Sequence, residues 1–326
     1  MIMLINKEGD DIPMLKSRKA QELSVLGNRR LNKEKTHWQL LLLLLPALIY
    51  IIIFNYWPMY GIQIAFKNYS ARKGIIGSPW VGFQYFKQFL EYPFFWQILR
   101  NTLTLSVYAL IAGFPFPIIL ALLLNEVWNQ RFKSTVQMVV FVPHFISTVA
   151  LCGMLALFFD RGSGIVNAIL EKLGHERFAF MSDGPTFKHL YVWSAVWQNS
   201  GFASVIYMAA LANVDGSLIE AATIDGANRW QIVYHINFKS ILPVVITQLI
   251  LKVGHLMSVG FEKVLLLQND LNMQYSDVIS TYVYRNGLAG AQFSYTTAIG
   301  LFNNIINLIL LLTVNYIVNR YSDNAI

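Results

Sequence analysis

Six long runs of apolar and almost uncharged residues constrain the fold of this chain more than any other feature. Each run reaches the ~20 residues that a helix needs to cross the hydrocarbon core of a bilayer. Because unpaired backbone amides and carbonyls are costly in lipid, a lipid-embedded run of this length has to be helical. The runs cover residues 39–60, 101–124, 134–159, 191–212, 241–261 and 294–319. The sequence therefore predicts an all-α, polytopic membrane protein with six transmembrane helices.

The composition excludes an ordinary soluble domain. The 326 residues are 55% hydrophobic and only 13% charged, whereas soluble domains carry about 25% charged residues. The run at 39–60 begins too late and continues too long for a cleavable signal peptide. The single cysteine, Cys152, lies inside a predicted span, so no disulfide framework is expected and the thiol is interpreted as a packing residue.

The polar segments between the runs divide the chain. Residues 1–38 form a polar tail, residues 61–99 form an outer loop whose aromatic stretch predicts a helix at the membrane interface, and residues 100–320 form the remaining membrane core before a short tail at 321–326. Residues 29–35 are rich in Arg and Lys, which favours a cytoplasmic N-terminus, and six spans return the C-terminus to the same side. The outer loop is also basic, so charge alone gives only a weak preference for this orientation.

The most ordered polar segment is residues 217–243, SLIEAATIDGANRWQIVYHINFKSILP. Ser217 and Glu220 have the spacing of a capping box, which predicts a helix start at Ser217. Gly226 is the residue type that ends a helix in the left-handed conformation. Asn228 and Gln231 repeat the capping pattern and predict a second helix. A rigid helix–turn–helix inside a loop is suited to docking against a partner.

This segment resembles the EAA loop of the permeases of binding-protein-dependent ABC importers. The pattern E-A-A, three residues, G, nine residues, I is matched in register by Glu220, Ala221, Ala222, Gly226 and Ile236. The resemblance implies that the loop is cytoplasmic, which places both termini in the cytoplasm, and that its first helix docks in a cleft of an ATPase subunit. The residues that the resemblance assigns to ATPase coupling are Ser217, Glu220, Ala221, Ala222, Asp225, Gly226 and Arg229.

The resemblance extends over roughly residues 40–320 and points to the carbohydrate-importing branch. Stretches such as QILRNTLTLS and YVYRNGLAGAQFSYTTAIGLFNNIINLILL resemble the larger permease of the maltose system and the transporters of polysaccharide fragments. One departure is Phe238-Lys239, which stands where the family has Leu-Pro. The resemblance implies oligosaccharide import across the cytoplasmic (inner) membrane of a prokaryote. The basic outer loops hint at an acidic sugar such as an alginate or pectin fragment.

The expected partners follow from what the chain lacks. No phosphate-binding G-x-x-x-x-G-K-[ST] loop occurs in the sequence, so the chain is not itself an ATPase and no cofactor is expected in it. The resemblance implies that two ATPase subunits bind ATP and Mg and dock on the loop. A second homologous permease subunit, an extracellular or periplasmic solute-binding protein, membrane lipid and the oligosaccharide complete the expected partners, and no nucleic acid is expected.

Polar residues inside the runs are the candidates for a substrate pathway. Ionisable groups in spans are costly and often functional. In a continuous helix, Lys252, His255 and Glu262 would lie close to one face, with Lys252 near the bilayer midplane. Residues 197–201 combine an aromatic ring with amide and hydroxyl groups that suit a sugar, and the resemblance adds Ser258 and Gly260. The candidate pathway residues are Trp197, Gln198, Asn199, Ser200, Gly201, Lys252, His255, Ser258, Gly260, Glu262, Asn303 and Asn304, and Asn307 is considered with them.

Simpler interpretations and other functions stay open. The same polar residues suit interhelical hydrogen bonding or an internal ion pair, and His144 suits a structural role. An ion-coupled secondary transporter of a small polar solute could use Lys252 and Glu262 as its relay, although this leaves the EAA loop unexplained. A membrane enzyme acting on polysaccharide or lipid would need paired carboxylates or metal ligands that the sequence does not show. Within the ABC class, an amino-acid or peptide substrate remains an alternative.

Overall fold

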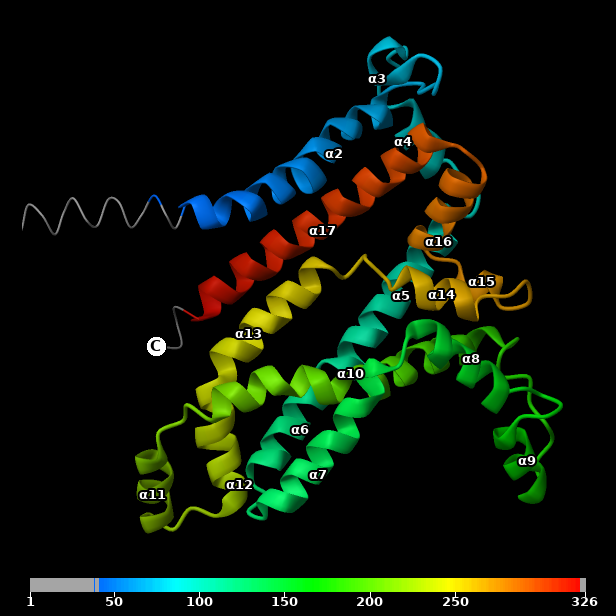
Figure 1. Ribbon diagram of the computed structural model, residues 1–326. Coiled ribbons are helices and arrows are strands. Elements are labelled where there is room, and N and C mark those ends of the chain that lie inside the picture. The colour runs from blue at the N-terminus through cyan, green and yellow to red at the C-terminus, as the bar shows by residue number, and fades with distance from the viewer. Residues whose placement is uncertain (1–37, 39–40, 323–326) are drawn as a thin grey trace, which may run out of the picture. The chain divides into compact units, whose positions relative to one another are not determined.

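The computed structural model describes residue 38 and residues 41–322, which form helices joined by turns (Figure 1). Among them, the only β pairing is an isolated bridge between Lys67 and Trp80. The all-α prediction is therefore confirmed for the described part of the chain. The basic segment at 29–35, the rest of the polar tail before residue 38 and the last residues of the C-terminal tail lie outside the described residues. The chain divides into two units, Met1–Gln63 and Ile64–Ile326, and each is described by itself.

The helices supply between four and six membrane spans. Four described helices are long and apolar enough to cross a bilayer, and two bent pairs of helices reach the same criterion only when both halves are counted together. The bends are 95° in the first pair and 76° in the second. The four helices are Leu41–Phe66, Phe95–Asn125, Arg229–Gly254 and Phe293–Arg320, and the pairs are Gln130–Phe145 with Thr148–Phe158 and Gly184–Leu211 with Gly216–Ile224.

The first unit contains most of one apolar helix. It begins at Leu41 among the described residues and includes a π-helical turn, η1 (Ile52–Tyr56), followed by α2 (Trp57–Met59). None of residues 41–60 is buried. A helix that is apolar on all sides and unburied has the surface expected of a segment surrounded by lipid or by neighbouring membrane helices.

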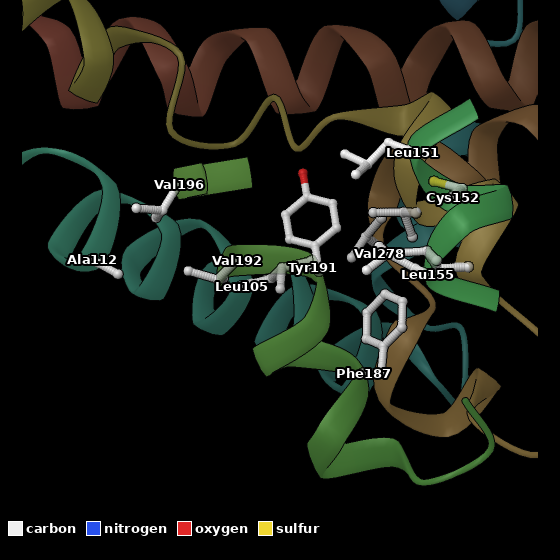
Figure 2. Packing of buried hydrophobic residues seen from close by; sticks show 12 residues of the cluster. Leu105, Ala112, Leu151, Cys152, Leu155, Phe187, Tyr191, Val192, Val196 and Val278 are labelled. Atoms are coloured by element: carbon white, nitrogen blue, oxygen red, sulfur yellow. The ribbon is translucent and has the colours of Figure 1, made fainter. Parts of the chain in front are cut away.

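The core of the second unit is built where α5 (Phe95–Gly113), α8 (Thr148–Phe158) and α10 (Gly184–Leu211) meet. Figure 2 shows the Tyr191 ring of α10 at the centre of this cluster. Leu105 of α5 lies on one side of the ring, and Cys152 and Leu155 of α8 lie on the other. The Cys152 thiol is buried in this cluster, and packing by this residue agrees with the sequence interpretation.

Two further clusters complete the packing. An aromatic cluster joins α4 (Gln84–Leu90), α16 (Ile279–Tyr284) and α17 (Phe293–Ser322), with Phe89 at its centre against Phe95 and Tyr282. The remaining cluster joins α6 (Pro115–Asn125) to the end of α10 and the start of α13 (Lys239–Gly254). Its buried members are Ile118, Ala121, Tyr207, Leu211, Ile241 and Val245.

The other elements are short. They are η2 (Tyr60–Phe66), α3 (Gly74–Gly77), α7 (Gln130–Phe141), η3 (Val142–Phe145), α9 (Ile165–Lys172), α11 (Gly216–Ile224), α12 (Arg229–Ile232), η4 (Val233–Phe238), α14 (Phe261–Leu267), α15 (Met273–Ser276) and η5 (Arg285–Ala289).

The interfacial helix predicted in the outer loop is two helices. α4 ends at Leu90 and α5 begins at Phe95, with Pro93 in the turn between them. Proline disfavours a helical conformation at the residue before it, which accounts for the interruption. Phe89 is only 2% exposed, so α4 contributes to the aromatic cluster instead of lying open on the surface.

Two of the predicted runs are not continuous helices. The third run bends after Phe145, at the end of the 3₁₀ turn Val142–Phe145 that contains Pro143. Ser147 then caps the new helix α8 by accepting the Ala150 N–H. The fifth run starts earlier than predicted, at Arg229, and its helix stops at Gly254 instead of Phe261. The placement of Lys252, His255 and Glu262 on one helix face is therefore wrong, because His255 ends α13 and Glu262 belongs to α14.

Candidate functional site

The first helix of the loop, α11, is capped by Asp215 and not by Ser217, the residue that the sequence pattern indicated. α11 begins at Gly216, and the Asp215 carboxylate accepts the Ser217 N–H at 2.9 Å. The predicted cap at Ser217 is wrong, because Asp215 and Ser217 are both good cap residues and the spacing to Glu220 favoured the second. The hydrogen bond from the Ser217 backbone lowers the pKa of the Asp215 carboxyl.

The turn after α11 has the geometry predicted for Gly226. Gly226 has a φ of 81°, which is the left-handed region that glycine occupies without steric cost. The Ala227 N–H donates to the Ala222 carbonyl at 2.9 Å and the Gly226 N–H donates to the Thr223 carbonyl at 3.1 Å. These two bonds form a Schellman motif, which satisfies the last carbonyls of the helix.

The second helix of the loop continues directly into the next membrane span. The Asn228 side chain accepts the Gln231 N–H at 2.9 Å, and the Gln231 side chain accepts the Asn228 N–H at 2.7 Å, so the predicted capping box is confirmed. α12 then passes through the π-helical turn η4 into α13 without a break. Phe238-Lys239 at the joint keeps the helix intact, whereas a proline there would remove a backbone donor.

α11 is an exposed helix held only at its ends. None of its residues is buried, and Ile224 is 86% exposed. Glu220 and Ala221 are also exposed, while Ala222 is half-buried. A hollow of about 340 Å³ separates α11 from α12 and η4, and it is lined in part by Ala222, Gly226 and His235. Such a helix offers its sides and this hollow to another protein.

The break between α13 and α14 is stabilised by side chains from two other helices. Residues 255–257 form a turn and residues 258–260 are extended or irregular, so the helix does not continue across the break. The Asn307 side-chain oxygen of α17 accepts the Met257 N–H at 2.9 Å, and its amide donates to the Ser258 hydroxyl at 3.1 Å. The Tyr191 hydroxyl of α10 accepts the Gly260 N–H at 3.1 Å. Non-helical backbone within a membrane protein needs such partners, because lipid offers none.

A polar cavity of about 190 Å³ lies against this break. Lys252, His255, Ser258 and Gly260 line it, so four of the predicted pathway residues are brought together. Ser106 of α5 joins them, and its hydroxyl is buried with no hydrogen-bond partner in the structure. Glu262, Asn303 and Asn304 do not line this cavity.

Tyr191 and Ser106 were not among the residues predicted from the sequence. Tyr191 forms the cavity wall, and the buried amine of Lys263 lies 5.3 Å from the centre of its ring. Both residues stand in apolar runs where hydroxyl side chains are common hydrogen-bond donors between helices. No local sequence pattern distinguishes these two residues from other hydroxyl residues in the runs. Their roles depend on the break at 255–260, which lies about 70 residues after Tyr191 and about 150 residues after Ser106.

The polar group at 197–201 serves mainly in contacts between helices. Gln198 donates to the Ile146 carbonyl at 2.7 Å, and the Asn199 side-chain oxygen lies 3.2 Å from Nδ1 of His144. The Gly201 Cα lies so close to the Val140 carbonyl that a Cβ could not be accommodated. Ser200 is half-buried. Trp197 is 54% exposed and lines a separate, apolar hollow of about 510 Å³ beside α8.

Comparisons with known proteins decide the family. Residues 113–323 match the model of the binding-protein-dependent transport system inner membrane component family. The chain belongs to this family. It is therefore an inner-membrane, multi-pass permease subunit of an ABC transporter.

Relatives cover nearly the whole permease. Protein LplB of Bacillus subtilis is 41% identical over 88% of this permease and 90% of its own length. The polygalacturonan/rhamnogalacturonan transport system permease protein YteP of the same organism is 39% identical over 88% and 89%. A solved bacterial ABC transporter involved in the import of the acidic polysaccharide alginate has a chain that superposes with a TM-score of 0.82, at 38% identity, covering 90% of this permease and 99% of that chain.

Proposed function

We propose that this permease imports acidic oligosaccharides and that the cavity at the α13–α14 break forms part of their path. The observation that carries the proposal is the placement of Lys252 and His255 in one cavity with Ser106 and Ser258. A cation beside hydroxyl groups matches the carboxylate and hydroxyls of a uronic acid, and charge-assisted hydrogen bonds are the strong ones. The polyuronide names of one relative and of the alginate transporter support the same substrate class.

The geometry of the break supports a transport role for this cavity. Transporters place their substrate sites near the bilayer midplane, at discontinuous helices whose free backbone groups face the substrate. Here the cavity adjoins the end of α13, and the broken backbone is stabilised from α10 and α17. A small displacement of either helix would therefore change the shape of the cavity.

The topology proposed for this permease has six spans, with both termini and residues 217–243 on the cytoplasmic side. α11 would dock on an ATPase subunit that binds ATP and Mg, and a second permease subunit would complete the pore. A solute-binding protein would deliver the oligosaccharide from outside. A second solved alginate ABC transporter, which is in complex with a periplasmic protein bound to an alginate pentasaccharide, supports this role. Closure of the ATPase pair would move α11 and drive alternating access.

The ion-coupled alternative is less consistent with the geometry. It requires Lys252 and Glu262 to act together as a relay. These residues lie on different helices, and only Lys252 lines the cavity. No feature of the described residues favours this mechanism over coupling to an ATPase.

The substrate proposal is tested with the complex that copurifies with the tagged full-length chain from its own host. ATP hydrolysis in proteoliposomes is measured with alginate pentasaccharide, trigalacturonate and neutral maltotriose, each presented with the copurified binding protein. Lys252→Gln removes a charge that lines the cavity, and Lys239→Gln removes an exposed charge at the start of the same helix as the matched control.

We expect at least one acidic oligosaccharide to stimulate hydrolysis. In Lys252→Gln its KM should rise about tenfold, which corresponds to about 1.4 kcal/mol for one lost charge-assisted contact. Lys239→Gln should leave this KM unchanged. Stimulation by maltotriose alone, or equal KM values in Lys252→Gln and Lys239→Gln, would overturn the proposal.

A further inference from the structure

The turn after α6 is hydrogen-bonded to the loop that carries α11. Glu126 caps the end of α6, and its carboxylate accepts a hydrogen bond from the Asn237 side-chain amide at 3.1 Å. Asn237 belongs to η4 and is only 1% exposed. Its side-chain oxygen is buried and has no partner among the described residues. The amide is therefore oriented by its single bond to Glu126, and breaking that bond would leave both polar atoms of Asn237 unsatisfied.

A second contact joins the same two segments. The Arg229 guanidinium lies over the Trp128 ring, 5.3 Å from its centre. Arg229 is the first residue of α12, and Trp128 is two residues beyond Glu126. Cation–π contacts at exposed sites are weak but directional. The two contacts bind the turn to the beginning and the end of the α12–η4 segment, so the segment cannot rotate about one contact without breaking the other.

α6 and α13 form one packed body behind these contacts. Ile118 and Ala121 of α6 share a buried cluster with Ile241 and Val245 of α13. α11 has no such support, because none of its residues is buried. A displacement of α11 therefore enters the rest of the chain through its two ends, the link to α10 and the Gly226 turn into α12. From α12 it reaches α6 through the turn at 126–128.

The joint coincides with a π-helical turn. η4 spans Val233–Phe238 and includes Asn237. π-helical turns interrupt the regular helical register and frequently lie at functional sites. Because such a turn is a point where a helix can bend, a contact to α6 at this position fixes the direction in which α12 can transmit a displacement.

We propose that Glu126 and Asn237 are positioning residues for energy coupling, which make the α6–α7 turn move as one body with the loop that carries α11. Arg229 and Trp128 support the same joint. This inference rests on the proposed docking of α11 to an ATPase subunit. It adds that the displacement reaches α6 directly, through this joint, as well as α13.

The test uses the copurified complex in nanodiscs. The native cysteine is first removed by Cys152→Ala. Cysteines are then introduced at Gln130 and Ile224, which are both exposed, and carry spin labels that report the distance between the turn and α11. The distance is measured without nucleotide and after trapping with ATP and vanadate. Asn237→Asp places two carboxylates side by side, and the double variant Glu126→Gln/Asn237→Asp restores an amide–carboxylate pair with donor and acceptor exchanged.

Trapping should leave the distance unchanged in the native complex and in the double variant. In Asn237→Asp the distance should change on trapping, and oligosaccharide stimulation of ATP hydrolysis should fall at least about fivefold, the lower end of typical coupling between sites. Basal hydrolysis should stay within about twofold, because no group near the nucleotide is altered. Trp128→Leu should weaken stimulation in the same direction, whereas Trp230→Leu, on the same helix as Arg229 and 74% exposed, should not.

Three results would overturn the inference. They are a distance that stays constant in Asn237→Asp, a folded double variant that behaves like Asn237→Asp, and equal effects of Trp128→Leu and Trp230→Leu. If no ATPase subunit copurifies with the native chain, the proposed docking of α11 itself is wrong. That failure appears before any substitution is made, so it is separable from a failure of the joint.

Discussion

The Tyr191 hydroxyl accepts the Gly260 N–H at 3.1 Å, and the same tyrosine ring lies beneath the buried amine of Lys263. One side chain from α10 thus contacts both the end of the broken segment and the start of α14. The Tyr191 ring is also part of the largest apolar cluster (Figure 2). The break is consequently fixed to the packed core by contacts within the chain itself.

Tyr191→Phe isolates the hydrogen bond from the packing. The ring remains in the cluster, but the Gly260 N–H loses its acceptor, which costs about 1–3 kcal/mol for a buried donor. We expect a lower Tm in detergent and a higher KM for the oligosaccharide that stimulates ATP hydrolysis. Tyr284→Phe is the matched control, since Tyr284 is 37% exposed and contacts Phe261 only through its ring. Identical KM values in the two variants would show that Tyr191 does not shape the site.

Gly226→Ala tests the turn at the end of α11. A Cβ at Gly226 would meet nothing within 4 Å, so the whole effect comes from the positive φ of 81°. The expected cost is about 1–2 kcal/mol. Hydrogen exchange of the Ala227 amide should accelerate, because its bond to the Ala222 carbonyl closes the turn. Gly216→Ala, at the other end of the helix with equal space and no positive φ, should leave that exchange rate unchanged.

Gly201→Ala separates packing from a role in the substrate path. A Cβ at Gly201 would overlap the Val140 carbonyl, so α10 and α7 would have to move apart. Overpacking of this kind costs about 1–3 kcal/mol, and the Tm should fall. Gly153→Ala is the control, since its Cβ would meet nothing within 4 Å. A Gly201→Ala protein with native Tm and altered KM would instead support the pathway role predicted from sequence.

The capping of α11 should depend on pH through Asp215. The hydrogen bond from the Ser217 backbone lowers the pKa of this carboxyl in the folded state. Because the folded pKa is lowered, the cap contributes its full stabilisation at pH values above the ordinary aspartate pKa of about 3.9. This stabilisation is lost as the pH falls through the lower pKa of the folded state. Below that range the Ser217 amide should exchange faster with solvent. In Asp215→Asn, which keeps an acceptor without a titrating group, the exchange corrected for its intrinsic rate should show no such step.

Patterns that are local in the sequence predicted most of the fold. Four of the six apolar runs correspond to helices that can span a membrane, and the other two fall within the bent pairs. Hydrophobicity over ~20 residues is a property of the run itself, so it can be read from the sequence. The Gly226 turn and the Asn228–Gln231 box were also readable, since each depends on residues within one helical turn. The sequence did not show which of Asp215 and Ser217 caps α11, because both are good cap residues and they stand only two positions apart.

Long-range contacts account for what the sequence did not show. α13 stops at Gly254 although the predicted run continues to Phe261, and the break is stabilised by Asn307 and Tyr191. Neither residue has a local pattern that points to Met257 or Gly260. The bond between Glu126 and Asn237 spans 111 residues and is invisible to any local rule. The sequence thus predicts which polar residues are candidates for the site. It does not predict which of them line the same cavity.

The exposure of α11 has a consequence for the life of the protein in the cell. Among the described residues, Leu218 and Ile224 are exposed on this short helix, and the proposed docking to an ATPase subunit would cover them. Uncovered apolar residues mark interaction sites or aggregation liabilities, and cells degrade proteins that are not stably folded. The half-life of the subunit should therefore lengthen when the ATPase is co-expressed, and a pulse-chase comparison with Ile224→Ser would reveal whether this helix also acts as the quality-control signal for assembly.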